Sequence, residues 1–170
     1  MTLQGLYRVE PLSSAHDRSQ FFSGSDPLDR YFREHASQDI KRRVATCFVA
    51  VNVESHEIAG FYTLAAAGVA LVDLAPDISR KLPRYPIVPA ALLARLALDR
   101  GQQGKGLGGV LPGDAVLRAA RADLGVFALL VDAKDDAARR FCEHRGFALL
   151  PGDGRRLCLP ITTALRRLGK

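Results

Sequence analysis

A glycine-dense, positively charged loop is the stretch of this sequence best suited to hold an anion. It follows the apolar run 90–98 and carries five glycines in the nine residues from Gly101 to Gly109, with Lys105 among them. Glycines leave backbone N–H groups unobstructed by Cβ atoms, so an anion can approach them closely. A helix that begins in the loop adds its dipole and its unpaired N–H groups. The segment therefore predicts a strand, a phosphate cradle and a helix start.

Three anion-binding patterns can be compared with this loop. The dinucleotide pattern G-x-G-x-x-G can be read at Gly104, Gly106 and Gly109, but it should open the first strand–helix unit of a domain, and here it comes after about 100 residues. The Walker pattern needs a Ser or Thr after Gly-Lys, and Lys105 is followed by Gly106. The pattern that fits is Q-x-x-G-x-G, with Gln103 as its first residue. A glycine-rich turn without a ligand is the alternative for the loop alone.

Q-x-x-G-x-G resembles the pyrophosphate loop of the GNAT family of acyl-CoA N-acetyltransferases. A second segment, 135–147, resembles the GNAT pattern N-x-x-A-x-x-x-Y-x-x-x-G-F and lies at the family's usual distance after the loop. The positions that match this second pattern are Asp135, Ala138, Cys142, Gly146 and Phe147. Two short motifs in the right order and spacing are much more specific than either alone.

Four further segments narrow the resemblance to the GNAT toxins of bacterial type II toxin–antitoxin pairs: 28–32, 60–64, 82–86 and 93–99. The resemblance implies an acetyl-CoA-dependent toxin, without a metal, that acetylates the α-amine of aminoacyl-tRNA and blocks translation. It also implies a ribbon-helix-helix antitoxin that neutralises the toxin, and a homodimer. Two alternatives stay open: a small-molecule or protein N-acetyltransferase, and a catalytically weak GNAT-fold binding module.

The GNAT resemblance also implies where acetyl-CoA binds. Backbone groups of the central strand would hydrogen-bond the pantetheine as an added strand, and N–H groups of the loop would hold the pyrophosphate. The N–H of Leu98 would stabilise the tetrahedral oxyanion. The expected cofactor-binding residues are Leu96, Ala97, Leu98, Gln103, Gly104, Lys105, Gly106, Leu107, Gly108 and Asp135.

Cys142 stands where the family has the tyrosine that protonates the departing CoA thiolate. A thiol with a pKa near 8.5 is intrinsically more acidic than a phenol near 10. It is also shorter by about a ring width, so its reach to the sulfur is smaller. Three interpretations are open: Cys142 works as the donor, a water or another tyrosine such as Tyr85 does so, or the chain is an attenuated toxin.

Charge and composition limit the class of protein. The net charge of +6 favours a polyanionic partner. The residues expected to contact tRNA are Lys41, Arg42, Arg43, Arg84, Arg95, Arg139 and Arg145. The sequence has no apolar run of about 18 residues and no evident signal peptide, so neither membrane insertion nor export is expected. Three cysteines, an odd number without a C-x-x-C pair, favour a reducing cytoplasm and argue against zinc.

The length predicts one domain over residues 1–170. The order of its elements resembles the GNAT acyltransferase fold, which implies an α+β domain with a central, mostly antiparallel mixed sheet flanked by helices. Asp26-Pro27 is expected to start a helix, with the acid as N-cap. The helix after the loop is expected from about Gly109 to Leu124, beginning near Pro112 or kinked there. Strands are expected at 3–12, 44–53, 58–71, 90–98 and 126–131, with a hairpin of 147–150 and 156–159, and a further helix at 135–144.

Overall fold

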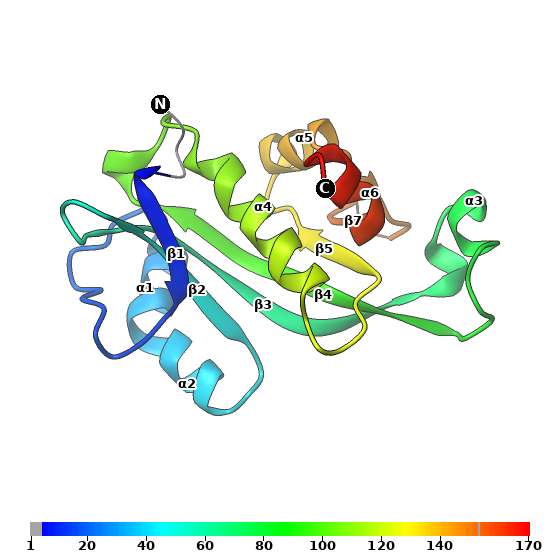
Figure 1. Ribbon diagram of the computed structural model, residues 1–170, viewed down its shortest axis with the longest axis horizontal. Helices are drawn as coiled ribbons and strands as arrows, with labels where there is room; N and C mark the ends of the chain where they lie inside the picture. The colour runs from blue at the N-terminus through cyan, green and yellow to red at the C-terminus, as the bar shows by residue number, and fades with distance from the viewer. Residues whose placement is uncertain (1–4, 153) are drawn as a thin grey trace. The chain divides into compact units, whose positions relative to one another are not determined.

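The structure, a computed structural model, describes residues 5–152 and 154–170 (Figure 1). The chain forms two compact units. The first unit comprises residues 1–65 and 94–115, and the second comprises 66–93 and 116–170. Three elements pass from one unit into the other: strands β3 (Ile58–Ala70) and β4 (Ile87–Leu98), and helix α4 (Leu107–Ala120). The expectation of a single domain stays a prediction.

The strands form a seven-stranded sheet in the hydrogen-bonded order β1-β2-β3-β4-β5-β7-β6. β1 (Tyr7–Pro11), β2 (Thr46–Asn52) and β3 are consecutive antiparallel neighbours. β5 (Ala128–Asp132) is parallel to β4 and antiparallel to β7 (Arg156–Pro160), which pairs with the two-residue β6 (Ala148–Leu149). The predicted mixed, mostly antiparallel sheet is confirmed.

In the first unit, one face of the sheet is covered by a helical segment. This segment consists of α1 (Asp26–Arg30), the π-helical turn η2 (Tyr31–His35) and α2 (Ala36–Lys41). Its aromatic residues pack on the sheet, and the rings of Phe32 and Phe61 stack with centroids 4.3 Å apart. The predicted helix start is correct, but its cap is not: Ser25 is the N-cap, and Asp26 is already helical.

The first turns of α4 cover the opposite face of the same strands. An added Cβ at Gly60 would lie 3.0 Å from the Ala97 carbonyl oxygen and 3.1 Å from the side chain of Leu111, so a glycine here favours the close approach of the helix to β3. Next to it, the hydroxyl of the fully buried Tyr62 donates a 2.5 Å hydrogen bond to Asp114 of α4.

The second unit builds its own core around β5. Leu130 and Cys158 pack with Val69, Leu71 and Val88 from the β3–β4 end. The connection between these strands holds the 3₁₀ turn η3 (Leu71–Asp73) and the short helix α3 (Pro76–Ser79). After β5 come α5 (Asp136–His144) and, at the C-terminus, α6 (Ile161–Arg167). No helix of the described residues is long and apolar enough to cross a membrane.

Several predicted boundaries were wrong. α4 begins at Leu107 and ends at Ala120, and Pro112 lies inside it. The fully buried Leu107 anchors its first turn, so the helix starts before the proline that was expected to delay it. β4 begins at Ile87 despite Pro89, whose carbonyl accepts from the Phe127 N–H. α6 was not predicted, and the expected first strand falls partly on residues 1–4, outside the described residues.

Candidate functional site

Hydrogen bonds within the first unit fix the start of the glycine-rich loop. Asp99 caps the 3₁₀ turn η4 (Arg100–Gln102), accepting a 3.1 Å hydrogen bond from the Gly101 N–H and another of the same length from Phe22. The Gln103 amide donates to the Leu98 carbonyl at 3.2 Å and to the Ser23 carbonyl at 3.0 Å. These contacts therefore anchor the loop as far as Gln103.

Two glycines of the loop have backbone conformations that other residues rarely adopt. Gly104 has φ +80° and Gly106 has φ +87°, both in the left-handed region. An added Cβ at Gly104 would meet no atom within 4 Å, so this part of the loop faces open space. Helix α4 begins immediately afterwards at Leu107. Exposed backbone, open space and a helix start together fit the pyrophosphate of a CoA thioester.

The end of β4 that leads into this loop lies beyond the residues paired with β5. The parallel register covers Ala90–Leu93. The N–H of Asp99 donates to Ala59 on β3 at 2.8 Å. Because backbone groups alternate along a strand, the N–H and C=O groups of Leu96 and Leu98 point away from β3, and those of Ala97 point toward it. Leu96 and Leu98 therefore have the orientation that an added strand of pantetheine requires.

The basic residues expected in the first unit lie in two places. Lys41, Arg42 and Arg43 are exposed at the end of α2, where Arg43 adopts a left-handed φ of +64°. Arg95 is half-buried on β4, and its guanidinium carbon lies 3.7 Å from the centroid of the Tyr31 ring. Sequence reasoning missed this stacking, because two positions separated by 64 in the sequence give no local signal.

The other expected site residues belong to the second unit. Asp135 caps α5, where its carboxylate accepts a 2.8 Å hydrogen bond from the Ala138 N–H. Arg139 pairs with Glu143 at 3.1 Å, and the Arg145 guanidinium carbon lies 4.1 Å from the Phe141 ring centroid. Arg84 is exposed in the connection between α3 and β4.

Cys142 lies on α5 with only 9% of its surface exposed. Burial is the main cause that raises the pKa of its thiol, and the nearby Arg145 opposes this effect. The thiol therefore keeps its proton at neutral pH, which is the form that a proton donor needs, although a raised pKa makes it a weaker acid. Tyr85, the alternative donor, is 69% exposed.

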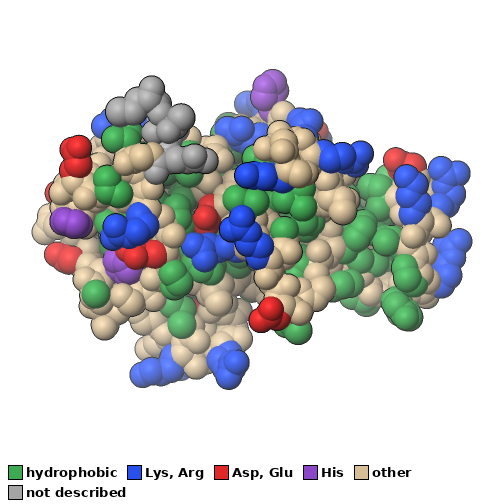
Figure 2. Space-filling model, viewed as in Figure 1, with side chains coloured by type: hydrophobic (Ala, Val, Ile, Leu, Met, Phe, Trp, Pro, Cys, Tyr) green, Lys and Arg blue, Asp and Glu red, His purple; other side chains and the backbone are tan. Residues whose placement is uncertain are grey.

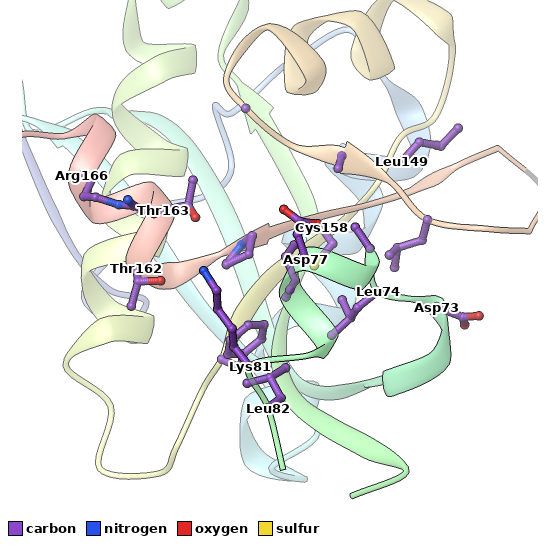
Figure 3. A pocket seen from close by; sticks show the side chains of 17 residues that line it. Asp73, Leu74, Asp77, Lys81, Leu82, Leu149, Cys158, Thr162, Thr163 and Arg166 are labelled. Atoms are coloured by element: carbon purple, nitrogen blue, oxygen red, sulfur yellow. The ribbon is translucent and has the colours of Figure 1, made fainter. Parts of the chain in front are cut away.

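The second unit also contains a cavity of about 380 Å³ that none of the expected site residues lines (Figure 3). Its apolar side chains include Leu74, Leu82 and Leu149, and the Lys81 side chain extends toward α6. Within the described residues, no group of three or more His, Cys, Asp or Glu side chains could hold a metal ion.

Comparison with known proteins identifies the family of this chain. No family model matches it. It is 38% identical, over 98% of its length and 99% of the relative, to a tRNA-acetylating toxin of Mycobacterium tuberculosis. The chain belongs to the family of tRNA-acetylating toxins. A probable toxin TacT of Sinorhizobium fredii is 30% identical, over 95% of this chain and 94% of the relative.

Solved structures of toxins of this family have the same fold. The structure of AtaT complexed with acetyl-methionyl-tRNAfMet superimposes with a TM-score of 0.85 at 25% identity, covering 96% of this chain and 99% of AtaT. A mutant AtaT toxin bound to the C-terminus of the antitoxin AtaR and to acetyl-CoA gives a TM-score of 0.78 at 22% identity, covering 96% and 99%. The predicted GNAT fold and the toxin family are both confirmed.

Proposed function

We propose that this chain transfers the acetyl group of acetyl-CoA to the α-amine of an aminoacyl-tRNA and thereby blocks translation. The observation that carries the proposal is the 38% identity to a tRNA-acetylating toxin over 98% of the chain. The left-handed Gly104 and Gly106 before α4, with open space at Gly104, support acetyl-CoA as the co-substrate, because they suit a pyrophosphate.

The acceptor chemistry suits an α-amine. Its nitrogen attacks the thioester carbonyl carbon, so that a C–N bond forms and the C–S bond breaks. The attacking nitrogen must be neutral, and an α-amine with a pKa of about 7.7 to 8.0 is neutral in roughly a tenth to a sixth of molecules at pH 7. A lysine side chain near 10.4 is almost fully protonated at this pH. A strong general base is therefore less necessary for an α-amine.

We assign one backbone group and one side chain to this step. The N–H of Leu98, which points away from β3, donates to the oxygen on which negative charge develops. Cys142 supplies the proton that the CoA thiolate takes up, and it does so weakly because burial raises its pKa. The amine nitrogen loses one proton to solvent as the amide forms, and the Cys142 thiolate takes one proton back from solvent. The remaining cofactor contacts are those expected from the sequence, except the backbone of Ala97, which points toward β3. Lys105 adds positive charge at the loop.

The raised pKa and short side chain of Cys142 favour one second candidate function, a GNAT-fold module that binds acetyl-CoA and its partners but turns over slowly. Incubation of the purified chain with a pool of charged tRNA and acetyl-CoA separates the two. We expect N-acetyl-aminoacyl-adenosine in the nuclease digest, identified by mass spectrometry. Binding of acetyl-CoA without this product supports the module, whereas acetylation of amines or peptides alone supports a different transferase.

We further propose a homodimer that acts in the cytoplasm, where charged tRNA is found, and a ribbon-helix-helix antitoxin as its partner. The solved complex of AtaT with its antitoxin supports the class of partner. Light scattering of the purified chain tests the dimer, and co-purification with the product of an adjacent small reading frame tests the antitoxin.

A further inference from the structure

Arg95 is a half-buried cation without a counter-ion. No hydrogen bond or ion pair joins its guanidinium to another described residue, although it lies on the central strand β4. A charge that is removed from water without a partner is destabilising unless an anion compensates it. The donor edges of the guanidinium are therefore available for an anionic ligand, which would compensate the part of the charge that is shielded from water.

Tyr31 holds the guanidinium in place. The Arg95 Cζ atom lies 3.7 Å from the centroid of the Tyr31 ring, which is a close cation–π stack. Tyr31 is 7% exposed and forms part of the core of the first unit. It opens the π-helical turn η2, a rare conformation that often occurs at functional sites.

Asp39 fixes Tyr31 in turn. The Tyr31 hydroxyl donates a 2.8 Å hydrogen bond to the Asp39 carboxylate. Burial, followed by this hydrogen bond, raises the pKa of Tyr31, so the ring stays neutral and keeps donating. Asp39 lies on α2, two residues before the exposed basic end of that helix, Lys41–Arg43. The three side chains form a chain of contacts from α2 to β4.

The geometry points to a phosphate-binding site in the first unit, built from Arg95, Tyr31 and Asp39, that holds the acceptor end of the aminoacyl-tRNA. The planar guanidinium, stacked on one face, leaves its N–H edge to bind a phosphate in bidentate fashion. Arg95 lies three residues before Leu98, or about 10 Å along the strand. This inference rests on the proposed function, and it makes Arg95 the tRNA contact and Tyr31 and Asp39 positioning residues.

The phosphate bound by Arg95 could belong to CoA or to tRNA. The geometry of β4 favours tRNA. Side chains alternate across a strand, so Arg95 shares the sheet face of Ala97, which packs in the core that Tyr31 belongs to. Leu98 belongs to the other face, where its side chain would contact an added Cβ at Gly60 and at Gly108 of α4. The loop proposed to bind the CoA pyrophosphate, Gly104–Gly108, follows the end of β4. Arg95 is therefore free of that role and can bind a second anion.

Steady-state kinetics of four variants and one control test this site, with charged tRNA and acetyl-CoA varied separately. For Arg95→Met we expect the KM for aminoacyl-tRNA to rise about 10-fold or more, as the loss of a charge-assisted contact predicts, with the KM for acetyl-CoA unchanged. Tyr31→Phe and Asp39→Asn should give smaller increases, about 2- to 5-fold, in the same parameter. Arg95→Lys should recover part of the loss. Arg8→Met, which removes an exposed arginine paired with Glu10, is the matched control.

Three outcomes overturn the inference. The first is an unchanged KM for tRNA in Arg95→Met with a lower melting temperature, because this indicates a structural role alone. The second is a raised KM for acetyl-CoA, because the phosphate then belongs to CoA. The third is an equal loss in Arg8→Met. Binding of uncharged tRNA by Arg95→Met, measured by fluorescence anisotropy, keeps the test independent of turnover. A wild-type chain that binds tRNA through Arg95 but acetylates no aminoacyl-tRNA contradicts the proposed function and not this site.

Discussion

At the scale of the residue, Cys142 is the proposed proton donor, and we expect it to limit the rate of acetyl transfer. Its thiol is buried, its pKa is raised, and it is shorter than the tyrosine expected at this position. General acid catalysis typically contributes about 10²- to 10⁴-fold to a rate. We therefore expect Cys142→Tyr to raise kcat for acetyl transfer to aminoacyl-tRNA at least about 10-fold, because a phenol restores the missing reach. Single-turnover assays with excess enzyme measure this directly.

Cys142→Phe is the matched control, because it adds the same ring without the hydroxyl. An equal gain in the Phe variant assigns the effect to packing. A Tyr variant that folds normally and is slower than the chain itself means that Cys142 is the native donor.

At the scale of the element, the turn between β4 and α4 is the proposed cofactor site. Gly106, with φ +87°, lies directly before the helix, and a valine there is both strained and obstructive. We expect Gly106→Val to weaken acetyl-CoA binding at least about 10-fold by calorimetry. Gly152→Val, at another positive φ with no atom within 4 Å of its Cβ, controls for backbone strain alone. Undiminished affinity in Gly106→Val would rule out the loop as the pyrophosphate site.

Elements of this kind were predictable wherever a local pattern defined them. The glycine loop, the strands and α5 could be found from spacing, because their signals lie within a few residues of each other. The contacts that hold the loop could not, since Gln103 bonds to the carbonyl of Ser23, 80 residues away. The start of α4 was also misjudged, because burial of Leu107 outweighed the local effect of Pro112. The Tyr31–Arg95 stack could not be predicted either, because its two residues are also far apart in the sequence.

At the scale of the whole molecule, the excess of positive charge is the property that suits a tRNA substrate. Figure 2 shows many exposed Lys and Arg side chains on the displayed face. Phosphate contacts make binding depend steeply on salt, with a slope of about 0.7 to 0.9 in log affinity per phosphate neutralised. Part of this charge is concentrated at the exposed end of α2, where Lys41 and Arg42 can be altered without the backbone constraint on Arg43.

We expect the double variant Lys41→Glu, Arg42→Glu to bind tRNA at least about 10-fold more weakly at low salt and to show a shallower salt slope, because two phosphate contacts are replaced by repulsion. Acetyl-CoA affinity should not change. The double variant Arg121→Glu, Lys170→Glu makes the same change in net charge at two other exposed positions. Fluorescence anisotropy with labelled tRNA across a salt series measures both variants. Equal losses in the two would mean that net charge alone attracts the tRNA, and no loss in either would favour a small-molecule or peptide acceptor.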